Sequence, residues 1–320
     1  MTTYNGEKFV SEQIDSILKQ TIPPCEIIIV DDCSKDATCS ILKEYAAKYP
    51  SLVKVYQNDA NHGPLYSFRR AFSLCSGEYI APSDQDDIWF EDKLEKCYEA
   101  CSDTVKVVFH QDRIWYSDGR TEDSHYPNFT LDDIIYSPRC TGHTALFHRS
   151  VLEVYEWVDF ICYDWALVLY GLGDKSYRQI DYVGCLWRRH AQALTDTVGG
   201  GSFVKHPRGK WKAFFAANKF LLTDVHNSVI ERDAHDQEII LSHFADTNPS
   251  VRPYIRLAQC FQKQTFCSFV KAGWTSVKIA LQRKRDMSFV EKCKTISFAF
   301  RYPYTWWLNL HEYLLSIGCN

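Results

Sequence analysis

The sequence lacks the patterns that mark several large classes of protein. Its 13 cysteines include no C-x-x-C pair, and no Cys/His cluster has zinc-finger spacing, so no structural zinc site is indicated. No basic-then-apolar leader opens the chain, and we therefore expect free thiols in a reducing cytoplasm. No apolar run reaches eighteen residues, so no membrane-spanning helix is predicted. Internal repeats and low-complexity tracts are also missing.

The composition is that of a globular protein with an uneven charge distribution. Of the 320 residues, 46% are apolar and 24% are charged, enough to bury a full core in one large domain with a smaller appendage. Residues 1–200 hold 19 Lys/Arg against 31 Asp/Glu, whereas residues 201–320 hold 17 against 9. The acidic first part would repel nucleic-acid phosphates, so we expect no nucleic-acid partner.

Short β-rich runs alternate with helical patterns through the first two thirds of the chain. Strands are predicted at 27–30, 53–56 and 78–81, and helices at 6–20, 36–45 and 64–74. This alternation predicts a mostly parallel, doubly wound α/β sheet. The glycines at 199–201 predict a loop, and a basic, aromatic and helical pattern follows. We therefore expect an α/β domain over 1–200 and a mainly helical C-terminal region over 201–320.

Two acidic clusters follow predicted strands. Asp31 and Asp32 come after the first buried strand, and the segment DQDD (84–87) comes after the third. Ligands of such sheets bind beyond the carboxyl ends of the strands. Carboxylates this close repel one another, and oxygen ligands suit Mg²⁺ or Mn²⁺. The alternatives are a solvated acidic turn at 84–87 and a helix-capping loop at 31–36.

Four segments together resemble the family 2 glycosyltransferases with the GT-A fold. They are TTYNG (2–6), VDDCSKD (30–36), SGEYI (76–80) and SDQDDIW (83–89). Within that family they most resemble bacterial rhamnosyltransferase-like members of polysaccharide clusters. Three shorter segments extend the resemblance, namely TGH (141–143), YDW (163–165) and WRRH (187–190). The resemblance implies a GT-A type, Rossmann-like sheet and an inverting transfer from a nucleotide-sugar.

The resemblance also implies roles for individual residues. It assigns donor-binding roles to Thr3, Tyr4, Asp31, Asp32, Asp84, Arg188 and His190, metal-binding roles to Asp84 and Asp86, and the role of catalytic base to Asp164. The implied metal is Mn²⁺ or Mg²⁺. The implied donor is dTDP-rhamnose or a UDP-hexose, and the implied acceptor is a glycan, in such pathways commonly lipid-linked.

The two ends of the sequence carry further expectations. Family members usually have an apolar strand directly before the Thr-Tyr-Asn, and only Met1 and Thr2 precede Thr3, so we expect a truncated first strand. The basic residues at 283–301 and the aromatic segment 302–308 suit an anionic membrane interface. This pattern predicts peripheral contact with the inner face of the cytoplasmic membrane. The alternative is packing of these aromatics on the catalytic core or on a second copy of the chain.

Two other functions compete with sugar transfer. A sugar-phosphate nucleotidyltransferase would need a glycine- and basic-rich loop near its start, which this sequence lacks. A catalytically inactive binding or assembly subunit could retain the same fold. Retention of Asp32, Asp84, Asp86 and Asp164 argues against the inactive subunit.

Overall fold

The computed structural model describes residues 1–126, 128–131, 141–159, 162–190, 228–283, 291–293, 295–301 and 303. The chain divides into two compact units. The first comprises Met1–Phe129, Arg139–Glu156 and Cys162–Ala193, and the second comprises Thr130–Pro138, Trp157–Ile161 and Leu194–Asn320. The glycine-rich loop at 199–201 and, except for residue 303, the aromatic segment 302–308 lie outside the described residues. The division into 1–200 and 201–320 stays a prediction.

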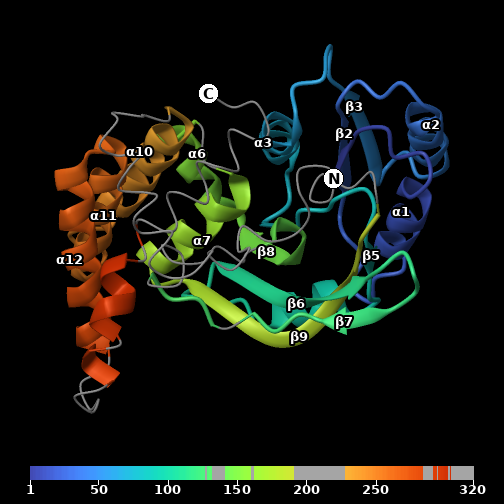
Figure 1. The fold of residues 1–320 in the computed structure, drawn as a ribbon. Helices are drawn as coiled ribbons and strands as arrows, with labels where there is room; N and C mark the ends of the chain where they lie inside the picture. Colours follow the sequence, from blue (N-terminus) through green and yellow to red (C-terminus); the bar gives the residue numbers. More distant parts are fainter. Residues whose placement is uncertain are drawn as a thin grey trace. The chain divides into compact units, whose positions relative to one another are not determined.

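A three-stranded parallel sheet begins the first unit. Its order is β1 (Thr2–Thr3), β2 (Ile27–Asp31) and β3 (Val53–Gln57). Helices α1 (Val10–Leu18) and α2 (Thr38–Lys48) cover one face, and α3 (Pro64–Leu74) covers the other (Figure 1). The connections β1–α1–β2 and β2–α2–β3 run the same way along the sheet, so right-handed crossovers place α1 and α2 on the same face. Every residue of β2 is buried, as expected for an apolar strand between two layers of helices.

A six-stranded sheet completes the first unit. It contains β4 (Tyr79–Ile80), β8 (Ala145–His148), β6 (Val107–Trp115), β9 (Tyr177–Arg188) and β5 (Ile88–Trp89) in that order, with β7 (Thr121–Asp123) paired to β6. Among the described strands of this sheet β6 and β9 pair in parallel and the other pairs are antiparallel, so the sheet is mixed. The remaining helices of this part are α4 (Lys93–Glu99), η1 (Gly142–Thr144), η2 (Arg149–Glu153), α6 (Val154–Trp157) and α7 (Tyr163–Gly173).

The strand β1 is two residues long and pairs with β2. An apolar cavity of about 190 Å³ lies beside it, with Met1, Ile28 and Ile80 among its lining residues. The amino group of Met1 is buried and donates to the Ile28 carbonyl (2.8 Å). Burial lowers the pKa of this amino group, because the charged form loses its hydration.

The described part of the second unit is helical. It contains α10 (Ser228–His243), η3 (Pro249–Val251), α11 (Arg252–Lys263) and α12 (Phe266–Arg283). Helix α11 packs against both α10 and α12 through a stripe that includes Tyr254, Leu257, Ala258 and Phe261, at the spacing of one helical face. The expected α/β fold with a helical C-terminal region is confirmed. Among the described residues, no helix combines the length and apolar character needed to cross a bilayer.

Candidate active site

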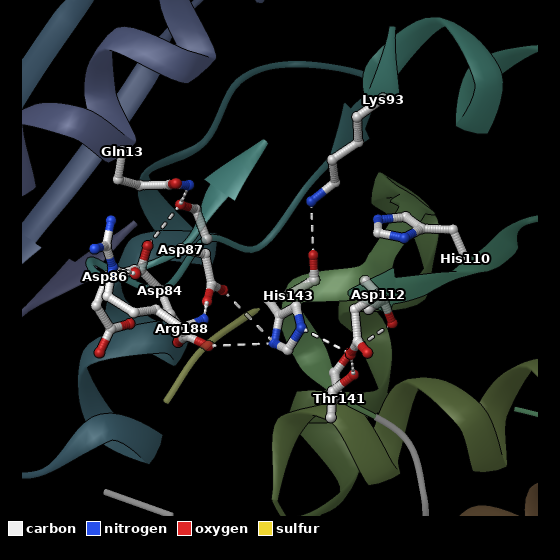
Figure 2. Close-up of polar contacts among 12 residues, drawn as sticks. Gln13, Asp84, Asp86, Asp87, Lys93, His110, Asp112, Thr141, His143 and Arg188 are labelled. Atoms are coloured by element: carbon white, nitrogen blue, oxygen red, sulfur yellow. Dashed lines mark hydrogen bonds and ion pairs between the residues drawn. The ribbon is translucent and has the colours of Figure 1, made fainter. Parts of the chain in front are cut away.

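Apart from Asp164, which is in helix α7, the predicted site residues lie at or near the ends of strands in the first unit. Asp31 ends β2, and Asp32 follows it. Residues 84–87, which we name the acidic loop, connect β4 to β5. Arg188 ends β9, and His190 follows two residues later. Figure 2 shows the acidic loop, Arg188 and the buried polar residues behind them. Strand ends from both sheets therefore contribute to one region.

Asp31 is fully buried and joins two neighbouring segments by hydrogen bonds. Its carboxylate accepts hydrogen bonds from the hydroxyl of Thr3 (2.9 Å) and from the amide (2.9 Å) and hydroxyl (2.6 Å) of Ser34. These bonds fix the end of β1 to the loop that follows β2. The predicted nucleotide roles of Thr3 and Asp31 would therefore be indirect, because each side chain is bonded to protein.

Asp32 orders the loop between β3 and α3. Its carboxylate accepts hydrogen bonds from the Asn58 side chain (2.7 Å) and from the amides of His62 (3.0 Å) and Gly63 (2.8 Å). Burial alone would raise the pKa of Asp32, but these donors hold it below its usual value. Asp32 is therefore a carboxylate at neutral pH, and its role toward a base or ribose stays a prediction.

The backbone of Tyr4 is joined to the acidic loop by Gln85. The Tyr4 amide donates to Gln85 Oε1 (2.8 Å), and Gln85 Nε2 donates to the Tyr4 carbonyl (3.0 Å). A Cβ on Gly6 would lie only 2.2 Å from Gln85 Oε1, so this approach requires glycine. From α1, Gln13 donates to the Ser83 hydroxyl directly before the loop (2.8 Å). The side chain of Tyr4 remains 43% exposed and available to a ligand.

Asp86 meets the two basic residues that follow β9. His190 Nε2 lies 2.9 Å from Asp86 Oδ2, and Arg188 Nε donates to the Asp86 carbonyl (3.0 Å). Arg188 also pairs with Glu12. The ring of Phe9 lies 4.4 Å from that of His190 and 5.0 Å from the Arg188 guanidinium carbon. Asp86 and His190 are 104 positions apart in sequence, and the fold brings them into one partly buried cluster.

Asp84 and Asp87 both face His143, and Asp87 Oδ1 also accepts a hydrogen bond from the Arg188 amide (3.4 Å). One ligand atom from each of Asp84, Asp87 and His143 lies within 4.8 Å of the others, a spacing that could hold a metal ion. The side chain of Asp84 is 40% exposed, whereas that of Asp87 is 1% exposed. Burial raises the pKa of Asp87 above its usual value, the charge of His143 opposes this rise, and the neighbouring Asp84 and Asp86 carboxylates add to it. Burial would lower the pKa of His143, but Asp87 and Asp112 raise it well above its usual value.

Asp164 lies in the first turn of α7. Burial raises its pKa to about 6, although its bonds with the Cys162 thiol and the Trp165 amide (2.8 Å) oppose the rise. The charge of Asp84 also raises this pKa, which places Asp164 within electrostatic reach of the acidic loop. A raised pKa suits a carboxylate that must accept a proton near neutral pH.

The predicted residues therefore separate into two groups. One group, Asp84, Asp86, Arg188 and His190, belongs to or contacts the acidic loop, to which Gln85 also joins the backbone of Tyr4, whereas Asp164 lies in α7 and is linked to Asp84 by its raised pKa. The other group, Thr3, Asp31 and Asp32, makes hydrogen bonds that organise the surrounding loops. Sequence reasoning included Gln85 and Asp87 in the acidic cluster at 84–87 without giving them a role, and it did not identify Lys93 or Asp112, because no local pattern distinguishes them.

The residues of the acidic region fit a divalent cation. Asp84 and Asp86 supply the oxygen ligands that Mg²⁺ and Mn²⁺ prefer, and His190, 2.9 Å from Asp86, could add a nitrogen, whereas the raised pKa of His143 keeps its ring protonated and unsuited to ligation. Asp87 Oδ2 is a buried oxygen without a hydrogen-bond partner among the described residues, which is also consistent with a cation nearby. The assignment of the metal to Asp84 and Asp86 stays a prediction.

The chain is similar in sequence to one protein family and to several known proteins. Residues 1–156 match the family described as glycosyl transferase family 2. An uncharacterized protein of Mycobacterium tuberculosis is 38% identical over 203 residues, covering 60% of this chain and 58% of its own length. The dTDP-rhamnosyl transferase RfbG of Shigella flexneri is 36% identical over 103 residues, covering 31% of this chain and 36% of its own.

A solved structure shares the fold over nearly the whole chain. Residues 1–349 of S. aureus TarS, in complex with UDP-GlcNAc, superpose with a TM-score of 0.53 at 17% identity. The match covers 99% of this chain and 90% of that one. At this identity the likeness concerns the fold. The chain spans less than two thirds of the length of the curated relatives described above.

Proposed function

We propose that this chain, which belongs to glycosyl transferase family 2 through residues 1–156, transfers a sugar from a nucleoside diphosphate to an acceptor hydroxyl with inversion. The observation that supports the proposal most is the contact of Arg188 and His190 with Asp86 in the acidic loop, and the raised pKa of Asp164, to which Asp84 contributes, adds to it. These residues offer a cation site, two groups for a diphosphate and a carboxylate base. The chemistry of sugar transfer needs all three.

Asp164 would be the general base. A single displacement requires removal of the acceptor's proton as its oxygen attacks the anomeric carbon, so that the new glycosidic bond forms while the bond to the diphosphate breaks. The half-buried carboxylate of Asp164 has a pKa of about 6, which leaves it ionised at neutral pH yet basic enough to accept this proton. The Trp165 amide fixes the orientation of one carboxylate oxygen.

The departing diphosphate would be bound by the cluster after β9. Arg188 offers a planar, permanently charged group suited to two phosphate oxygens, and His190 adds a second donor when it is released from Asp86. Asp84 and Asp86 would hold a Mn²⁺ or Mg²⁺ ion, which neutralises charge on the leaving group when bound. Tyr4, whose side chain is partly exposed, would contact the nucleotide beside Asp32.

We favour dTDP-rhamnose as donor, with a UDP-hexose as the second choice. The similarity to RfbG, a dTDP-rhamnosyl transferase, supports the first choice. The UDP-GlcNAc complex of the TarS neighbour is the reason to keep UDP-sugars in the assay. The product would be a cell-surface polysaccharide, and the acceptor a glycan carried on a lipid.

A lipid-linked acceptor would bring the enzyme to the cytoplasmic face of an anionic membrane. Helix α12 carries no acidic residue, and Lys271, Trp274 and Lys278 lie exposed at the spacing of one helical face. Trp274 is 55% exposed. Basic residues around an exposed tryptophan suit the interface of anionic lipids. Sedimentation with vesicles tests this contact. Binding should require phosphatidylglycerol and weaken in Lys271→Glu/Lys278→Glu, and equal binding to neutral vesicles would contradict it.

The donor assignment is tested with purified full-length chain. Each nucleotide-sugar is incubated with Mn²⁺ or Mg²⁺ and an acceptor extract, and release of UDP or dTDP is measured. We expect release from one donor class, dependent on the metal and lost in Asp164→Asn. Metal-independent release, or release that survives Asp164→Asn at the wild-type rate, would contradict the proposed chemistry.

A further inference from the structure

A buried ion-pair network lies directly behind the acidic loop. His143 Nε2 is 3.2 Å from Asp112 Oδ2, and His143 Nδ1 is 3.7 Å from Asp84 Oδ2 and 3.8 Å from Asp87 Oδ2 (Figure 2). The imidazole therefore has carboxylates on both sides. Asp112 belongs to β6, His143 to η1, and the two other acids to the acidic loop. One side chain thus connects the central strand of the sheet to the loop.

Further contacts hold both Asp112 and His143 in place. Asp112 is fully buried, and its Oδ2 atom also lies 3.2 Å from the Tyr126 hydroxyl and 3.4 Å from the Thr141 hydroxyl. The carbonyl of His143 accepts a hydrogen bond from Lys93 Nζ (2.6 Å). Lys93 is fully buried as well, and its Nζ lies 3.6 Å from the centre of the Trp89 ring.

The energetics favour a positional role. A buried carboxylate is costly unless it is paired, and Asp87 and Asp112 are both almost completely buried. Within the described part of the chain, Asp87 forms its ion pair with His143. A buried salt bridge is weak evidence for stability, because hydrophobic replacements often stabilise equally well. Its geometry here nevertheless restricts where the acidic loop can lie.

We propose that His143 and Asp112 are positioning residues for sugar transfer, which hold Asp84 and Asp87 so that the acidic loop presents Asp86 to the donor's diphosphate and cation. This inference rests on the proposed function. Neither residue would touch the reacting atoms. Groups that orient metal ligands in this way typically change metal affinity or activity by about 10- to 100-fold when replaced.

The test compares His143→Gln and Asp112→Asn with a control matched for burial. His110 is also fully buried on β6, and its Nδ1 lies 2.6 Å from the Gln111 carbonyl. His110→Gln should therefore lower the melting temperature without moving the acidic loop. For every variant, UDP and dTDP binding is titrated by calorimetry over a range of Mn²⁺ concentrations, and thermal unfolding is followed separately.

We expect His143→Gln and Asp112→Asn each to raise the Mn²⁺ concentration needed for nucleotide binding by about tenfold or more. The double variant should lose little beyond the larger single effect, because both replacements break the same bridge. His110→Gln should keep the wild-type Mn²⁺ dependence. Lower melting temperatures with an unchanged Mn²⁺ dependence in the two test variants would overturn the positioning role alone. Absence of metal-dependent binding in the wild type would overturn the proposed function as well.

Discussion

The raised pKa of Asp164 predicts that the rate of sugar transfer depends on pH in the range from about 5 to 7. A general base works only when it is deprotonated, so the reaction should slow as pH falls through this pKa. With the value of about 6, the carboxylate is roughly 90% ionised at pH 7 and roughly 10% ionised at pH 5. The expected kcat/KM at pH 5 is therefore about tenfold lower than at pH 7.

The size of this decrease separates a buried base from a solvated one. An ordinary aspartate, with a pKa near 3.9, would lose only about 7% of its ionised form over the same interval. The assay measures initial rates of donor consumption at low donor concentration and fixed Mn²⁺, from pH 5 to pH 8. Fluorescence of the nine tryptophans reports whether the protein stays folded at each pH.

Asp164→Asn provides the matched variant, because the amide keeps the shape and cannot accept the proton. It should lower kcat by roughly 10²- to 10⁴-fold and remove the acidic limb of the profile. A wild-type profile that is flat between pH 5 and pH 7, with folded protein throughout, would refute the assignment of Asp164 as a base with a raised pKa. A limb that persists in Asp164→Asn would assign the titration to another group.

Three further predictions concern stability. Gly142→Ala should markedly lower the melting temperature, because the added Cβ would lie 1.9 Å from the Tyr163 hydroxyl, and an unchanged value would contradict this packing. Asp32→Ala should lower the free energy of unfolding in urea by roughly 3 kcal/mol, because it removes the acceptor of three hydrogen bonds in the loop. Asp59→Ala, which removes an 89% exposed carboxylate from the same loop, should lower it far less. In a chain that begins at Met1, the amino group has a lower pKa in the folded state than in the unfolded state. The unfolded state therefore binds more protons below pH 8, so the free energy of unfolding should rise with pH up to about 8. Acetylation of the amino group should abolish this rise.

The parallel sheet was predictable because its signals are local. The apolar run 27–30 became β2, and the helix expected at 64–74 is α3 at Pro64–Leu74, which starts with a proline at its first turn. The acidic loop at a strand end followed from the same reasoning. The mixed order of the second sheet was not predicted, since the pairing of β8 with β4 and β6 joins residues more than 30 positions apart. No short pattern encodes such a register.

The site was predictable only where a residue and its neighbours carry the signal. Asp84 and Asp86 stand in a recognisable segment, whereas the contact between His143 and Asp112 joins two elements 31 positions apart. A single histidine in a sequence is more often structural than functional, and its position between carboxylates becomes visible only in the fold. The buried lysine at position 93 is a similar case, because its partner is a backbone carbonyl.

The most direct test of the account is calorimetric titration of the purified chain with UDP and with dTDP, in the presence and absence of Mn²⁺. The account predicts that one nucleotide binds only when Mn²⁺ is present and that Asp86→Ala loses this binding while remaining folded. Preference for one base would also narrow the donor sugar. Absence of binding to either nucleotide, or binding that is equal without the metal and in Asp86→Ala, would contradict the central claim that the acidic loop is a donor site.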